Sequence, residues 1–83
     1  MSESESALRA RAQTLFAKGK LLRSVPLRSV AGSGQGLACV LCGELIHDTE
    51  AEIDVYFLPR PFEPYFFHPT CYTLWFNESF AAR

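Results

Sequence analysis

Three cysteines and one histidine occur in this chain as two compact pairs, Cys39-Val-Leu-Cys42 and His68-Pro-Thr-Cys71. Together they form the pattern C-x2-C-x25-H-x2-C, which uses every cysteine and one of the two histidines. Three thiolates and one imidazole are a complete tetrahedral ligand set for zinc. The pattern therefore predicts one structural Zn2+ bound by Cys39, Cys42, His68 and Cys71, with iron as the less favoured metal for these ligands.

The spacing within each pair suits a shared metal ion. Two residues between Cys39 and Cys42 allow a tight turn that aims both sulfur atoms at one point, and Gly43 lets the backbone bend behind the metal. His68 and Cys71 are three residues apart at the start of a predicted helix, so both project from one face. The helix N-terminus also favours the thiolate form of Cys71.

Other chemistry fits these residues less well. A thioredoxin-like redox pair opens a helix after a strand, whereas Cys39 follows a glycine-rich segment. A lone histidine is typically a core residue, but His68 lies beside a third cysteine. A closed ligand set leaves no position for a catalytic water, and His47, a conceivable extra ligand or base, is more simply a surface histidine. We therefore expect no enzyme activity.

The sequence predicts one amphipathic helix near the N-terminus. Serines between residues 2 and 6 offer N-cap hydroxyls, and apolar side chains then recur at helical spacing until a stop before Pro26. These residues are Leu8, Ala12, Leu15, Phe16, Gly19 and Leu22, and Gly19 is the position at which the helix could fray. The narrow apolar stripe predicts that the helix docks on the rest of the domain.

A β-hairpin followed by a second helix is predicted in the C-terminal half. Apolar and polar side chains alternate over 53–57, which is typical of a strand. Three prolines in segment 59–64 cannot continue a central strand, so we expect a turn there and a returning strand at 65–67. Segment 70–80 is predicted to be helical, with Pro69 in its first turn.

Length and composition indicate one small globular domain. The 83 residues are 48% hydrophobic, and no apolar run approaches the roughly 20 residues of a membrane helix. The acidic N-terminus is unlike a signal peptide, so we expect a cytoplasmic protein with reduced thiols and no membrane contact. We divide the chain into an N-terminal helical and extended segment (1–31), a glycine-rich linker (32–36) and a zinc domain (37–83).

A tight turn with the first two cysteines, a β-hairpin and a helix with the last two ligands are predicted in this order. The same order of elements is typical of a treble-clef zinc finger, which the chain therefore resembles. Segments 39–46 and 67–72, with Trp75, resemble the first zinc module of LIM domains. They are even more similar to small, uncharacterised bacterial proteins with a single C-x-x-C-G-E-x-I … F-H-x-x-C-x-x-x-W finger. The resemblance implies a small α+β zinc-binding fold, a treble clef with an added N-terminal helix. It covers roughly residues 36–78, and the second ligand quartet of a LIM domain is absent from this sequence.

Aromatic side chains suggest where a partner would bind. Most of the aromatic residues lie in the C-terminal third, and we expect most of them to be core. A subset surrounds the proline-rich turn and predicts a protein-binding or self-association surface: Phe57, Phe62, Tyr65 and Phe66. Our first hypothesis is therefore a zinc-stabilised protein-interaction module, a small regulatory or adaptor protein that binds another protein or forms a homodimer.

An uneven charge distribution supports a second hypothesis. Residues 1–36 carry six basic and two acidic side chains, whereas residues 37–83 carry two basic and seven acidic side chains. The basic residues could contact the phosphates of a nucleic acid: Arg9, Arg11, Lys18, Lys20, Arg23 and Arg28. The overall net charge of -1 and the separation of basic from aromatic residues favour the protein-interaction hypothesis over this nucleic-acid-binding regulator.

Overall fold

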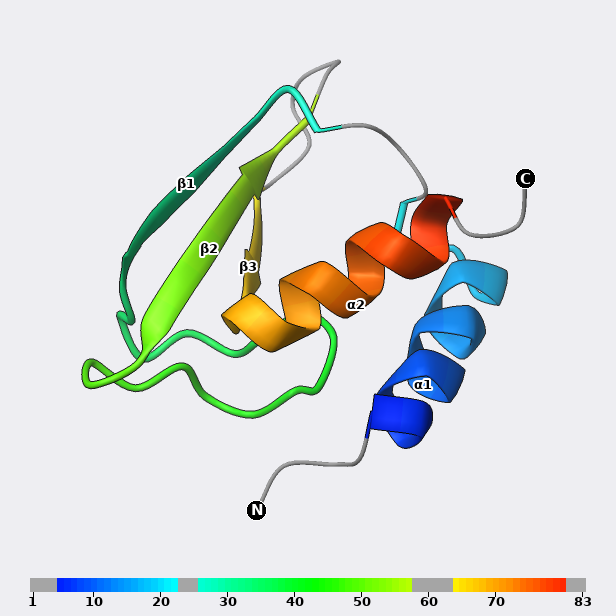
Figure 1. The fold of residues 1–83 in the computed structure, drawn as a ribbon, viewed down its shortest axis with the longest axis horizontal. Coiled ribbons are helices and arrows are strands. Elements are labelled where there is room, and N and C mark those ends of the chain that lie inside the picture. The colour runs from blue at the N-terminus through cyan, green and yellow to red at the C-terminus, as the bar shows by residue number, and fades with distance from the viewer. Residues whose placement is uncertain (1–4, 23–25, 58–63, 81–83) are drawn as a thin grey trace.

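In the computed structural model, which describes residues 5–22, 26–57 and 64–80, these segments form a small α+β domain (Figure 1). The described elements are α1 (Glu5–Ala17), β1 (Arg28–Ser33), β2 (Ala51–Tyr56), β3 (Tyr65–Phe67) and α2 (Pro69–Phe80). The three strands form an antiparallel sheet in the order β1-β2-β3. α2 packs against β2 and β3, and α1 packs against α2. No helix in the described segments has the length and apolar character needed to cross a membrane.

The N-terminal helix is confirmed, but it ends earlier than its apolar spacing predicted. Gly19 has a φ of 73°, and the N–H of Lys20 donates a hydrogen bond to the carbonyl of Leu15. Glycine adopts this left-handed conformation without a Cβ clash, so it ends the helix. Leu22, which the spacing placed on the apolar stripe, therefore lies beyond α1.

The segment after α1 is held by two aromatic side chains. The N–H of Leu22 donates to Tyr65 Oη at 3.0 Å, and Trp75 Nε1 donates to the carbonyl of Leu22 at 2.9 Å. Leu21 is buried at 3% exposure. The C-terminal half thus anchors the segment after α1 through both backbone polar groups of Leu22.

Strand β1 is the element that the sequence did not predict. It has no alternation of apolar and polar residues, and it includes Gly32 and Ser33 from the expected linker 32–36. Its register with β2 pairs Val30 with Asp54 and Gly32 with Glu52. Tertiary pairing with β2 therefore joins in one strand the end of the expected extended segment (28–31) and the first two residues of the expected linker.

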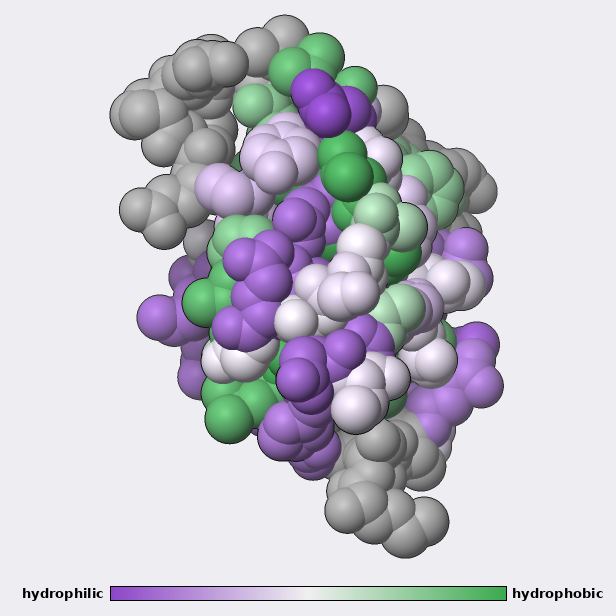
Figure 2. All heavy atoms as spheres, turned by 90° about the vertical axis from the view of Figure 1, so that its left-hand side faces the viewer, coloured by the Kyte–Doolittle hydropathy of each residue, from purple (hydrophilic) through white to green (hydrophobic). Residues whose placement is uncertain are grey.

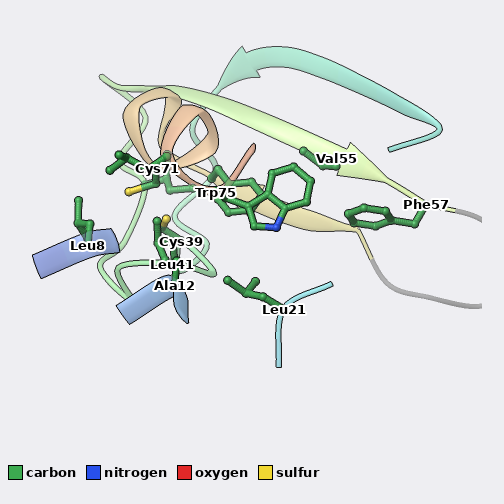
Figure 3. Close-up of a cluster of buried hydrophobic side chains, with 12 residues drawn as sticks. Leu8, Ala12, Leu21, Cys39, Leu41, Val55, Phe57, Cys71 and Trp75 are labelled. Carbon is green, nitrogen blue, oxygen red and sulfur yellow. The ribbon is translucent and has the colours of Figure 1, made fainter. Parts of the chain in front are cut away.

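The predicted hairpin strands and C-terminal helix are confirmed by β2, β3 and α2. The expected turn at 59–64 lies almost entirely outside the described residues. Val55 and Phe67 point from the sheet toward Trp75 of α2, and the Phe67 and Trp75 rings stack with centroids 5.3 Å apart. Figure 3 shows part of the resulting core, in which α1, α2, the sheet and the first cysteine pair all contribute side chains. The buried hydrophobic residues include Leu8, Ala12, Leu21, Cys39, Leu41, Ile46, Val55, Phe57, Phe67, Cys71, Leu74 and Trp75.

Candidate metal centre

The first cysteine pair lies in a tight backbone turn. The N–H of Gly43 donates to the carbonyl of Cys39 at 2.9 Å, and the N–H of Cys39 donates to the carbonyl of Glu44 at 2.8 Å. Gly43 has a φ of 81°, as its position behind the metal site predicted. These bonds fix both thiol groups on the same side of the turn, which we call the knuckle (residues 38–45).

The second pair is positioned by the start of α2. The carbonyl of His68 accepts the N–H of Tyr72 at 2.8 Å, so His68 is the cap residue and Cys71 lies in the first turn. Cys39 and Cys71 are both buried, and Figure 3 shows their sulfur atoms close together at one end of the core. The helix start therefore presents one imidazole and one thiol to the knuckle.

All four predicted ligands are brought together by these two elements. The sulfur atoms of Cys39, Cys42 and Cys71 and a ring nitrogen of His68 lie within 4.8 Å of one another. Cys42 Sγ is 3.4 Å from His68 Nδ1, so Nδ1 is the ring nitrogen that faces the cluster. A tetrahedral zinc ion with Zn–S distances of about 2.3 Å separates its ligand atoms by about 3.8 Å. The cluster therefore fits a single metal ion.

The thiols strongly affect one another's ionisation. A hydrogen bond from the Cys71 thiol lowers the pKa of Cys39 to about 4, although burial opposes this change. The same hydrogen bond raises the pKa of Cys71, and burial raises the pKa of Cys42. One thiolate is thus favoured and two neighbouring thiols keep their protons, because adjacent thiolates repel. A metal cation supplies the positive charge that allows all three to ionise.

The outer nitrogen of His68 has its own partners. His68 Nε2 lies 3.3 Å from the carbonyl of Leu45 and 3.6 Å from a carboxylate oxygen of Glu50. Acceptors on this side favour a proton on Nε2 and leave the Nδ1 lone pair for a metal. Nothing in the sequence pointed to Leu45 or Glu50, because the end of the knuckle and the turn after it reach His68 only in the folded chain.

The cluster is closed on one side and accessible on the other. Cys42, His68 and Cys71 line a groove of about 520 Å³, with Leu8 of α1 and Leu74 of α2 also contributing to its wall. Cys39 lies on the opposite, core-facing side and is 1% exposed. His47, considered as a further ligand, is exposed and does not belong to the four-residue group.

Comparison of the chain with protein-family models, with curated proteins and with solved structures gave no match. The interpretation of the site therefore rests on its own donor set and geometry.

Two of the basic residues expected to contact phosphate are engaged within the domain. Arg11 Nε donates a hydrogen bond to the carbonyl of Leu41, which ties α1 to the knuckle. Arg9 pairs with Glu5 at 2.7 Å and approaches Glu78 of α2 at 3.8 Å. These contacts give both arginines a role in joining α1 to the rest of the domain.

The remaining basic residues do not gather at one place. Lys18 and Lys20 are exposed after the last turns of α1, whereas Arg28 begins β1 and lies over the Tyr56 ring at 5.6 Å. Figure 1 shows α1 and β1 on opposite sides of the molecule. Arg23 lies outside the described residues.

The aromatic residues that were predicted to form a binding surface differ in their burial. Phe57 is 5% exposed and packs edge-on against Tyr65 and Trp75, so the expectation that it contacts a partner is corrected: it is a core residue. Tyr65 and Phe66 are half-buried, and Phe62 lies outside the described residues. Phe57 is drawn inward because a domain of this size needs large side chains to fill its core.

Proposed function

We propose that this protein is a treble-clef module in which one zinc ion has a structural role and the protein surface binds another protein. The observation that carries the proposal is the closed Cys3His donor set. Three thiolates and an imidazole complete a tetrahedral zinc site without a water ligand, and thiolates reduce the Lewis acidity of the metal. A metal held in this way stabilises the fold and leaves function to the surface.

The order of the elements supports the treble-clef interpretation. The knuckle comes first, with an isolated bridge between Ala38 and Leu45, and the antiparallel pair β2–β3 follows. α2 then supplies the last cysteine in its first turn. This is the sequence of parts expected from the resemblance to single-finger zinc proteins, with α1 added on the groove side of the metal centre.

The metal role is tested by loading the full chain with Co2+, whose absorption spectrum reports ligand type and geometry. We expect one Co2+ per chain, a tetrahedral visible spectrum with thiolate charge-transfer bands, and displacement by one equivalent of Zn2+. An octahedral spectrum, or binding that survives replacement of Cys39 by serine unchanged, would contradict the proposal.

The binding role is tested against the nucleic-acid alternative. Because Arg9 and Arg11 already have partners in the domain, we expect the zinc-loaded chain to give no salt-dependent shift of DNA or RNA. A shift that weakens steeply with salt and is lost in a Lys18→Ala/Lys20→Ala double variant would instead favour the nucleic-acid-binding regulator.

A further inference from the structure

The sheet has one covered edge and one open edge. On the β3 side, the carbonyl of Phe66 points away from β2 and accepts the N–H of Val40 at 2.9 Å, so the knuckle covers this edge. On the other side, β1 pairs with β2 alone in the described parts of the chain, and all of its residues are exposed. An open edge is a template for pairing with another strand.

The hydrogen-bond pattern identifies the backbone groups on this open edge. Gly34 donates to the carbonyl of Glu50 at 2.9 Å, which continues the register of β1 with β2. Because bonded and non-bonded pairs alternate in antiparallel sheets, Val30 and Gly32 exchange hydrogen bonds with β2. The residues that alternate with Val30 and Gly32 along the strand are Ser29, Ala31 and Ser33. Their N–H and C=O groups therefore point outward, away from β2.

We propose that two copies of the chain associate through antiparallel pairing of their β1 strands, with the two-fold axis at Val30. The outward groups of Ser29 and Ala31 then bond to those of Ala31 and Ser29 in the second copy. The two three-stranded sheets become one continuous sheet, and both α2 helices lie on the same face. This inference rests on the proposed binding function and names its partner as a second copy.

Val30 favours pairing of the strand with itself. Its side chain is 37% exposed, which makes it one of the few large hydrophobic residues on the described surface. At the two-fold axis it faces Val30 of the second copy in a non-hydrogen-bonded pair, in which opposing side chains approach most closely. Pairing thus removes from water an apolar side chain that the single chain leaves exposed.

Gly32 and Arg28 are complementary in the same register. In the described residues no atom lies within 4 Å of the position that a Cβ at Gly32 would take, and its φ is not positive, so the single chain gives no reason for glycine here. The register places the second copy's Arg28 opposite Gly32, where a side chain would obstruct the guanidinium.

The character of the surface agrees with pairing through the main chain. Figure 2 views the molecule from the side on which β1 lies, and near-neutral and hydrophilic residues dominate the middle of this face. Its hydrophobic residues form separate patches. Affinity would come mainly from hydrogen bonds along the strand, with Val30 as the apolar contact at the centre.

Sedimentation equilibrium on the zinc-loaded full chain tests the proposal. We expect the wild type to have twice the mass of the chain and Val30→Lys to have the mass of one chain, because two lysines would face each other at the axis. The matched control is Phe76→Lys, which changes a side chain of similar exposure (38%) on α2 and should leave the dimer intact. Circular dichroism and zinc content verify that both variants are folded.

A cysteine placed at the axis tests the register. Val30→Cys should form a disulfide-linked dimer under mild oxidation because its Cα faces its own copy at about 4.5 Å, within disulfide range. Gly32→Cys should not, since it faces Arg28. A wild type with the mass of one chain, or a dimer dissociated by Phe76→Lys and not by Val30→Lys, overturns the pairing. Either result leaves the cobalt test of the metal role unaffected, so the two proposals fail separately.

Discussion

Arg11 of α1 and Leu41 of the knuckle are joined by a hydrogen bond from the guanidinium Nε to the backbone carbonyl. The two residues are thirty positions apart in the chain. The bond makes the N-terminal helix part of the wall around the metal centre, together with Leu8, which lines the groove beside the ligands. Arg11, which the sequence suggested as a phosphate contact, is thus engaged in a hydrogen bond within the domain.

Replacement of Arg11 by alanine should destabilise the domain without removing the metal. A hydrogen bond from a charged donor contributes about 1.5–3 kcal/mol, and partial solvent access at this site favours a loss of about 1–2 kcal/mol. Urea unfolding of the zinc-loaded protein measures the loss. Lys18→Ala, which removes the same charge from an exposed position, is the control and should change the free energy of unfolding little. Equal effects of the two substitutions would assign the loss to charge alone.

Removal of the metal should unfold the C-terminal half. Structural zinc contributes about 10–16 kcal/mol of apparent binding free energy, which matches or exceeds a typical total stability of roughly 5–15 kcal/mol. Trp75 is the single tryptophan and is 0% exposed, so its fluorescence reports this directly. We expect a red shift of its emission on chelation and in Cys71→Ser. A chelated protein that retains the native emission spectrum and near-ultraviolet circular dichroism would refute the structural role.

Glu50 should strengthen metal binding through His68. The hydrogen bond from the His47 N–H lowers the pKa of Glu50, so its carboxylate is ionised at neutral pH. Loss of such an outer partner typically costs 10–100-fold in metal affinity, and the shared Leu45 carbonyl places Glu50→Gln near the lower end, at about tenfold. Competition with a chromophoric chelator measures the affinity. Glu44→Gln removes an equal charge from the exposed end of the knuckle and should have a smaller effect.

Glu52 should make stability depend on pH in a defined direction. Its side chain is buried on β2, and a hydrogen bond with Asp54, followed by burial, raises its pKa. The folded state therefore holds this proton more tightly than the unfolded state, and the stability of the wild type falls as pH rises through the raised pKa.

Glu52→Gln removes this penalty and can still accept the hydrogen bond from the Gln35 N–H. Thermal unfolding from about pH 5 to about pH 8 should show the variant gaining melting temperature over the wild type as pH rises. A difference that is constant over this range would mean that Glu52 does not titrate there.

The amino-acid sequence by itself determined the four residues of the Cys3His cluster and most of the regular structure. The cysteine and histidine spacing acts within a few residues of backbone, so local geometry predicts the knuckle, the bend at Gly43 and a helix start beside Pro69. The two helices and the β2–β3 pair follow from apolar periodicity, which is also local.

Tertiary structure alone decided the parts that depend on contacts between distant segments. Strand β1 exists because β2 supplies its hydrogen bonds, although the sequence predicted only an extended segment and the start of a linker there. Gly34 is required because the backbone of His47 passes so close that a Cβ would collide with its carbonyl oxygen. Arg11 and Glu50 acquired their partners, and Phe57 its burial, in the same way. Such contacts leave no periodic signal in the chain, because each depends on how a loop closes in space and not on the residues beside it.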